Sequence, residues 1–371
     1  MRAVEWEAPG RLRLTERPGP RAEPGQAVVA VAACGICGSD LHSYRDGWAA
    51  RPGQVLGHEF VGTVVEAPRV EGLAPGTRVV VRPLIPCGEC DPCRRGDPQL
   101  CARGLKLGIG YAFDGAFAER VLVPRAVVGL TVFPLPDSVD DRAAALVEPL
   151  AVACHAVRRG GDPGGREALV LGAGTIGLGV AAFLRLGGAS VTVVDPSPLR
   201  RQAAASIGRP AADTLEPPPA AARPADPSAP PLSSIRTLDP AVERPDADAF
   251  DLVFECAGAD ATMAAAIRAV RPGGAVVVSA LFGRPVEISP DRFSVKEAAL
   301  VGAFGYRDEF AEVIETLASG AIDAIALVSH ELPLERIDEA FQIQSDPSES
   351  LKVLVRPRPG RSRRRCRGPG R

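Results

Sequence analysis

The chain has 371 residues, of which 46% are hydrophobic and 24% charged, and its formal net charge at pH 7 is −2. This length is typical of two domains with sizeable cores, and the charge balance argues against a protein that mainly coats nucleic acid or membranes. No apolar signal core opens the chain, and no apolar run reaches the roughly 18 residues of a spanning helix. We therefore expect a cytoplasmic protein, in which the nine cysteines stay reduced and clustered ones bind metal.

The first 130 or so residues are predicted to form a mostly β domain. Short apolar runs alternate with proline and glycine, as in strands joined by turns, at 12–14, 27–31, 60–66 and 77–81. Residues 141–158 then change to a helical period, which Gly160 and Gly161 are expected to end.

A dinucleotide-binding pattern follows. Residues 168–171 predict a buried parallel strand, a glycine turn comes next, and a helix over 178–186 leads to a strand over 190–194. Such a turn brings the pyrophosphate to a helix N-terminus, and an acidic residue after the second strand binds the ribose hydroxyls. The residues predicted to bind the cofactor are Gly172, Gly174, Thr175, Ile176, Gly177, Asp195 and Arg200.

The charges near the end of the second strand bear on the choice of cofactor. Asp195 would repel a 2′-phosphate, which favours NAD over NADP. Arg200 and Arg201 qualify this, because an arginine there can accept a phosphate or stack on adenine.

The alternation of predicted strands and helices is interrupted once in the rest of the chain. Residues 211–248 are rich in proline and alanine, which predicts a loop or poorly ordered insert with one short strand near 214–215. Regular structure is then predicted as a strand over 251–256, a helix over 261–270, a turn over 271–274, a strand over 275–279, helices over 309–318 and 335–342, and a strand over 351–355. The Arg-, Pro- and Gly-rich tail over 356–371 predicts disorder.

Four cysteines lie close together in a loop rich in glycine, proline and aspartate: Cys87, Cys90, Cys93 and Cys101. Four thiolates suit a closed tetrahedral zinc site, which is structural because it has no open position. The alternatives are free surface thiols, an iron–sulfur cluster and a nucleic-acid-binding zinc ribbon. The scarcity of aromatic residues in the loop does not favour the ribbon.

A second constellation supplies a thiolate, an imidazole and a carboxylate, the ligand types of a catalytic zinc with one open position: Cys37, His58 and Glu59. Taken singly, such residues are more often packed or hydrogen-bonded side chains. Ser39 and His42 follow Cys37 and supply a hydroxyl and an imidazole that can carry a proton away. Ser39 or Asp40 also fits the N-cap of a helix.

Together these motifs resemble the zinc-dependent medium-chain alcohol dehydrogenases, from residue 1 to about 355 apart from 211–248. The resemblance is carried by Gly-Ile-Cys-Gly-Ser-Asp-Leu-His at 35–42, Gly-His-Glu-Phe-Val-Gly at 57–62, the four-cysteine loop and the glycine turn. Glu-Pro-Leu-Ala-Val at 148–152 is similar to the polyol, butanediol and threonine dehydrogenase branch. The resemblance implies a further helix and a connecting stretch within 211–248, where the sequence is instead Pro-rich, so we expect less cover over the adenine side.

The resemblance implies an α/β fold, with a GroES-like mostly β catalytic domain and a Rossmann domain built on a doubly wound parallel sheet. We expect the catalytic domain with both zinc sites over 1–150, the NAD-binding domain over 151–290, a return segment that completes the catalytic domain over 291–355, and the tail over 356–371. A homodimer or homotetramer is also implied.

Carried over by position, Cys37 and His58 match ligands of the catalytic zinc. Glu59 matches a residue that binds the metal or lies just behind it, and Glu148 matches a further ligand that acts directly or through water. Ser39 and His42 match the proton relay, and the four clustered cysteines match the structural zinc, which gives two zinc ions per chain.

The implied reaction is hydride transfer to NAD from a small secondary alcohol or polyol, whose pocket we expect on the loops 43–50 and 106–113. One alternative is the same fold acting on an amino-sugar or aminocyclitol alcohol or on an aldehyde, or using NADP. An alternative of another class is a zinc-stabilised binding protein without catalysis. Retention of the full ligand and relay set speaks against it, and neither a membrane nor a nucleic acid is expected as a partner.

Overall fold

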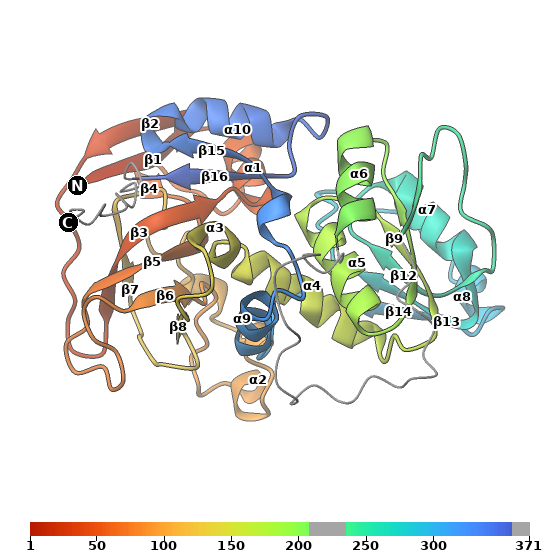
Figure 1. Cartoon of the computed structure of the whole chain (residues 1–371), viewed down its shortest axis with the longest axis horizontal. Helices are drawn as coiled ribbons and strands as arrows, with labels where there is room; N and C mark the ends of the chain where they lie inside the picture. The colour runs from red at the N-terminus through yellow and green to blue at the C-terminus, as the bar shows by residue number, and fades with distance from the viewer. Residues whose placement is uncertain (208–234, 358–371) are drawn as a thin grey trace, which may run out of the picture.

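A computed structural model describes residues 1–207 and 235–357. They form two lobes, between which lies the long helix α4 (Val147–Gly160) (Figure 1). Among the described residues, no helix is both long and apolar enough to cross a membrane. The strand predicted near 214–215 and all but the first two residues of the predicted tail lie outside these ranges.

The first lobe is built on a seven-stranded sheet with the order β15-β16-β3-β5-β6-β8, in which β7 also pairs with β3. A smaller sheet has the order β2-β1-β4. The strands are β1 (Arg2–Ala8), β2 (Arg11–Glu16), β3 (Ala27–Gly35), β4 (Gln54–Val55), β5 (Glu59–Glu66), β6 (Arg78–Val81), β7 (Arg120–Val123), β8 (Val132–Pro134), β15 (Val328–Pro333) and β16 (Lys352–Arg356). Strand β3 is almost wholly apolar and buried, which suits its central place.

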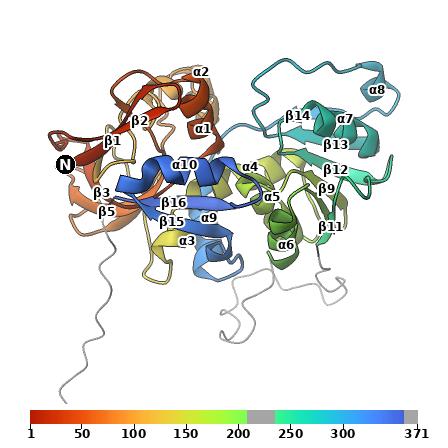
Figure 2. The ribbon, with the colours of Figure 1, turned by 90° about the horizontal axis from the view of Figure 1, so that it is seen from above.

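The C-terminal segment returns to this lobe. Strand β16 pairs antiparallel with the end of β3, where Leu354 lies opposite Gly35 and Val355 opposite Cys34. Figure 2 shows β15, β16 and helix α10 (Ile337–Ser345) lying along β3. The remaining helices of this lobe and its border are α1 (Gly38–Asp46), α2 (Asp91–Arg94), α3 (Asp141–Ala144) and α9 (Phe310–Ala318). The single helical stretch predicted over 141–158 is divided between α3 and α4, and α4 ends at Gly160.

The second lobe holds a six-stranded sheet with the order β11-β10-β9-β12-β13-β14, and every pairing in it is parallel. Its strands are β9 (Glu167–Leu171), β10 (Ser190–Val194), β11 (Arg236–Leu238), β12 (Phe250–Glu255), β13 (Val270–Val278) and β14 (Ala299–Gly302). Its helices are α5 (Thr175–Leu186), α6 (Pro198–Ser206), α7 (Asp260–Ala269) and the short α8 (Asp291–Ser294). Chain order across the sheet is third, second, first, fourth, fifth, sixth, the doubly wound order of dinucleotide-binding domains. The predicted α/β fold class is confirmed.

Two predictions in this lobe were wrong. Strand β11 lies within 211–248, where we expected only a loop and a strand near 214–215; burial of Ile235 and Leu238 holds it beside β10. The turn predicted over 271–274 lies inside β13 instead. Pairing with β12 passes from Val270 to Ala275, so the Arg-Pro-Gly-Gly sequence bulges out of the strand without ending it.

Candidate active site

The glycine turn joins β9 to α5. Gly172 has φ +95°, a backbone conformation that favours glycine. A Cβ on Gly177 would lie 1.8 Å from the carbonyl oxygen of Gly172, so no larger residue fits. This cradle leaves the backbone at the start of α5 open to close approach, as a bound pyrophosphate requires.

Asp195 follows β10 and holds the turn in place. One carboxylate oxygen accepts a hydrogen bond from the Ala173 amide and the other from the Ser197 amide, both at 2.8 Å. Arg201 on α6 is occupied by an ion pair with Asp239 at 2.9 Å. Arg200 is partly buried beside the return segment, where its Nε reaches the Ser350 carbonyl at 3.5 Å.

The catalytic ligand candidates converge at one end of the first lobe. Cys37 lies two residues after β3, His58 directly precedes β5, and Glu59 is the first residue of β5. Because Gly35 pairs with Glu59 across these antiparallel strands, the two segments meet. The ligand atoms of Cys37, His58 and Glu59 all lie within 4.8 Å of one another. The set of a soft thiolate, an imidazole and a carboxylate fits zinc.

Asp40 fixes the backbone on both sides of this cluster. Its carboxylate accepts hydrogen bonds from the Cys37 amide at 3.0 Å and from the Gly57 amide at 3.3 Å. It also lies 3.6 Å from Nδ1 of His58, a buried nitrogen without a hydrogen-bond partner. The N-cap prediction was wrong, since Cys37 caps α1 and Asp40 is the third helical residue, which reaches back to the Cys37 amide.

Glu59 is balanced by a cation from the other end of the sequence. Lys352 on β16 lies 2.6 and 2.9 Å from its two carboxylate oxygens and donates to the Ile36 carbonyl at 2.9 Å. Glu59 is 1% exposed and Lys352 3% exposed. A buried carboxylate next to a metal site thus has a fixed counter-charge.

The two relay candidates lie on α1, three residues apart. Ser39 is buried, and its hydroxyl is 3.3 Å from that of Tyr111. The His42 side chain is 39% exposed, so its ring can exchange a proton with water. A Cβ built on Gly283, from the second lobe, would lie 3.8 Å from the His42 ring. The relay therefore lies where the two lobes meet.

Glu148 enters from the first turn of α4. Burial raises its pKa to about 7; the His58 charge lowers it, and the Glu59 charge raises it further. Within the described part of the chain, the group of ligand atoms within 4.8 Å of one another comes from Cys37, His58 and Glu59 and does not include Glu148. Glu148 is close enough to interact electrostatically with His58, as a water-bridged ligand would be.

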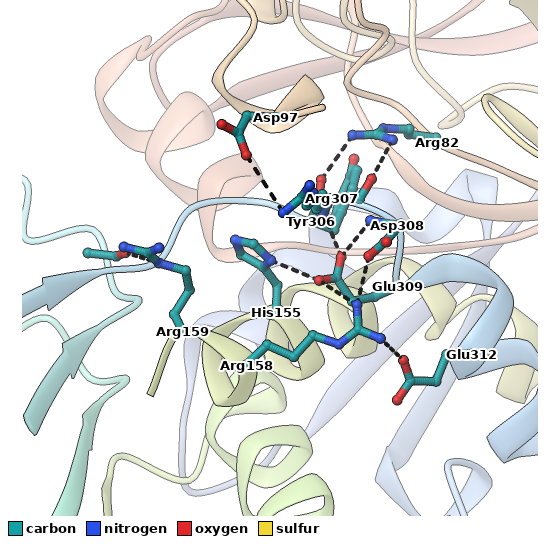
Figure 3. A network of polar contacts seen from close by, with 11 residues as sticks. Arg82, Asp97, His155, Arg158, Arg159, Tyr306, Arg307, Asp308, Glu309 and Glu312 are labelled. Atoms are coloured by element: carbon teal, nitrogen blue, oxygen red, sulfur yellow. Dashed lines mark hydrogen bonds and ion pairs between the residues drawn. The ribbon is translucent and has the colours of Figure 1, made fainter. Parts of the chain in front are cut away.

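A polar network surrounds Tyr306 (Figure 3), a residue close enough to Glu148 to lower the pKa of its carboxyl. The Arg82 guanidinium donates to the carbonyls of Tyr306 and Arg307, both at 2.9 Å, and lies 5.1 Å from the Tyr306 ring centre. His155 contacts the Glu309 carboxylate at 2.8 Å. Burial alone would raise the pKa of Glu309, but the contact with His155 and backbone amides outweigh it and lower the pKa.

The four clustered cysteines form a separate group on the first lobe. Their sulfur atoms lie within 4.8 Å of one another, with separations of 3.4, 3.8 and 3.9 Å among them. A tetrahedron with Zn–S distances of about 2.3 Å has edges of about 3.8 Å, so the group fits zinc. Amide groups of Cys93 and Ala102 lower the pKa of Cys90 to about 6, which favours its thiolate. Arg307, 3.9 Å from Asp97, links this loop to the network around Arg82.

Replacing Cys90 with serine is expected to remove one zinc ion per chain and to lower the melting temperature by about 5 °C or more, because a structural zinc contributes folding free energy. Zinc content by atomic absorption and calorimetric melting would measure both effects. Serine at Cys154, which is buried in α4, is the control that should retain all zinc. Full zinc content in the Cys90→Ser protein would contradict the assignment of this site.

The fold and these two groups define a class of protein. The molecule combines a dinucleotide-binding sheet with a cluster that fits zinc, and a hydroxyl and an imidazole lie next to that cluster. This combination is typical of a zinc-dependent oxidoreductase that uses a nicotinamide cofactor.

Comparisons with known proteins agree with this class. Residues 23–137 match the alcohol dehydrogenase GroES-like domain, and residues 175–319 match the zinc-binding dehydrogenase domain. The chain is 32% identical over 372 residues to (R,R)-butanediol dehydrogenase of Bacillus subtilis, with coverage of 96% of this chain and 100% of that protein. It is 31% identical to L-galactonate-5-dehydrogenase of Escherichia coli, with coverage of 92% and 94%. A zinc-binding dehydrogenase structure from Sinorhizobium meliloti bound to NADP has a TM-score of 0.80 and 31% identity, with coverage of 96% and 99%.

The chain therefore belongs to the zinc-dependent medium-chain alcohol dehydrogenase family. It is an enzyme, and the GroES-like and Rossmann parts expected from the resemblance are confirmed. The reading as a binding protein without catalysis is set aside.

The sequence analysis assigns no role at the metal site to three residues that the structure places there. Asp40 was considered only as a helix cap, and Lys352 and Tyr111 were not singled out. For Asp40 a signal existed, since it lies in the same motif as Cys37. For the other two, only the fold brings them to the cluster.

Proposed function

We propose that this enzyme oxidises a secondary alcohol group of a vicinal diol or polyol by transferring its hydride to NAD, with two zinc ions bound per chain. The observation that carries the proposal is the group of Cys37, His58 and Glu59, of which His58 and Glu59 are buried, with the Ser39 hydroxyl nearby. The names of the butanediol and galactonate dehydrogenases to which the chain is similar support the substrate class.

In this proposal Cys37 and His58 hold the catalytic zinc, and Glu59 and Glu148 are the carboxylates available to complete or support it. When bound, zinc supplies Lewis acidity that lowers the pKa of a substrate hydroxyl, and the nicotinamide accepts the hydride. Ser39 takes the hydroxyl proton and passes it toward His42, which releases it to water. The glycine turn and Asp195 hold the cofactor.

The test is NADH formation by the zinc-loaded protein with secondary alcohols, vicinal diols, polyols, aminocyclitols and threonine. We expect turnover with a diol or polyol. Turnover with aminocyclitols alone would replace this proposal with the amino-alcohol alternative. If protein that retains both zinc ions forms no NADH with any of these substrates, the proposed substrate class is contradicted.

NAD is the cofactor we propose, in place of NADP. Support comes from Asp195, whose negative charge is fixed by two amides at the end of β10, and from Arg201, which Asp239 already occupies. The observation that favours NADP is the related Sinorhizobium structure, which was solved bound to it.

Replacing Asp195 with asparagine is expected to raise the ratio of kcat/KM for NADP to that for NAD by about 10- to 100-fold, because a like-charge contact costs several kcal/mol. The asparagine side chain keeps one oxygen to accept from the Ala173 amide, but its NH2 group replaces the oxygen that accepts from Ser197, so we also expect weaker binding of both cofactors. Steady-state kinetics with both cofactors measure the ratio. A wild-type preference for NADP, or an unchanged ratio in the variant, would contradict the role of Asp195.

We also propose a homodimer or homotetramer. Support comes from β14, which stands at the edge of its sheet and is apolar. Leu300 is 47% exposed and Phe304 nearby is 48% exposed, whereas charged residues commonly protect such edges. Light scattering would give the mass in solution, and the mass of a monomer would contradict this proposal.

The division into residues 1–150, 151–290 and a return segment over 291–355 is retained as part of the proposal. So is a cytoplasmic location, where cysteines stay reduced and can act as metal ligands.

A further inference from the structure

Tyr111 lies against the candidate zinc ligands although no motif pointed to it. Its hydroxyl is 3.3 Å from the Ser39 hydroxyl and 3.3 Å from Nε2 of His58. Its ring lies at 5.0 Å from the His58 ring and meets the edge of Trp48 at 6.4 Å. Trp48 is 41% exposed, so the two aromatic rings connect the buried cluster to solvent.

The position of Tyr111 is fixed by its loop. The Tyr111 carbonyl accepts a hydrogen bond from the Gln54 side chain, and the next carbonyl, that of Ala112, accepts one from Arg51 at 2.6 Å. The Ala112 amide closes a turn onto Gly108 at 2.9 Å. A hydroxyl held in this way is pre-organised to recognise a ligand rather than to follow one.

Metal binding changes the hydrogen bonds open to this hydroxyl. Nδ1 of His58 faces Asp40, which leaves Nε2 as the nitrogen for a metal. Once its lone pair is engaged, Nε2 no longer accepts from Tyr111, and Ser39 alone remains of the two partners. Ser39 is itself needed by the reacting hydroxyl. Ser39 can accept from that hydroxyl with one lone pair and from Tyr111 with the other, so the Tyr111 oxygen keeps lone pairs for a second substrate hydroxyl, a contact that a substrate with one hydroxyl does not make.

We propose that Tyr111 recognises a second hydroxyl of the substrate, on the carbon next to the one that is oxidised, and so selects vicinal diols and polyols over simple alcohols. This inference rests on the proposed function and assigns part of its specificity to one side chain. Two hydroxyls 3.3 Å apart, on Ser39 and Tyr111, can each engage one of two oxygens on neighbouring carbons.

The test compares Tyr111→Phe with the wild type on 2,3-butanediol and 2-butanol, which differ by one hydroxyl. We expect kcat/KM for the diol to fall about tenfold or more, and that for 2-butanol to change less than about twofold, because only the diol loses a hydrogen bond. Binding is measured separately by titrating 3-hydroxy-2-butanone and 2-butanone into the enzyme–NADH complex and following cofactor fluorescence. Only the hydroxyketone should bind more weakly to the variant.

Tyr44→Phe is the matched control: Tyr44 lies in the segment 43–50 where we expected the pocket, but its ring packs on Phe341 at 5.1 Å and against the core of the first lobe. It should leave the diol preference unchanged. An equal loss with both alcohols would assign Tyr111 to the relay or the metal and overturn the inference, as would no loss. If the wild type turns over neither alcohol, the proposed reaction fails on these substrates, yet a hydroxyketone preference that Tyr111→Phe removes would still support the inference. Absence of that preference in the wild type would overturn it.

Discussion

Replacing Cys37 with serine is expected to lower kcat by about a thousandfold or more, with the fold and NADH affinity nearly unchanged. The physical reason is the loss of one soft ligand from a cluster of three, which removes the Lewis acid whose effect on the transition state is several kcal/mol. The glycine turn and Asp195 lie on the other lobe, so the cofactor site keeps its contacts. Stopped-flow turnover, zinc content and NADH fluorescence would measure the three quantities.

Cys34→Ser is the matched control for this experiment. Cys34 lies three residues earlier, is fully buried at the end of β3, and its thiol points to the Gly35 carbonyl, which a serine hydroxyl can also use. The control should keep its zinc and most of its activity. A Cys37→Ser enzyme with the wild-type rate would refute the catalytic-zinc proposal, and equal losses in both variants would point to a packing defect.

The sequence predicted best those parts of the enzyme whose residues lie close together along the chain. The glycine turn needs six consecutive residues, and steric limits at Gly172 and Gly177 explain why they are glycine. The four cysteines converge because one loop carries them all. Cys37 and His58 are farther apart, but Cys37 comes after the strand predicted at 27–31 and His58 comes before the one predicted at 60–66. Antiparallel pairing of β3 with β5 therefore brings them together.

The parts that sequence missed depend on contacts between distant segments. Lys352 is 293 residues from Glu59, and nothing in the closing strand distinguishes it from a solvated lysine. Tyr111 lies in a loop without periodicity, whose shape is set by side-chain bonds to the segment 51–54. Strand β11 is three residues long and follows a Pro-rich stretch, so its apolar pattern is too short to predict a strand.

The pair of Lys352 and Glu59 leads to the second large expected effect. Replacing Lys352 with methionine should lower the free energy of unfolding by about 3–5 kcal/mol, because it leaves a buried carboxylate without its counter-charge. Methionine is similar in length, so the loss is chiefly electrostatic. The Ile36 carbonyl loses its donor as well, and this carbonyl directly precedes Cys37. We therefore expect weaker zinc retention along with the lower stability.

Urea unfolding of Lys352→Met, Glu59→Gln and the double variant would test this as a cycle. The double variant should be destabilised by clearly less than the sum of the single variants, since removing both charges leaves neither unpaired. Arg356→Met is the control from the same strand. Arg356 pairs with Glu331 where their side chains are 24% and 31% exposed, and its loss should cost no more than about 1 kcal/mol. Additive single effects, or a cost for Lys352→Met as small as that of the control, would mean that the buried pair does not hold the return segment to the catalytic cluster.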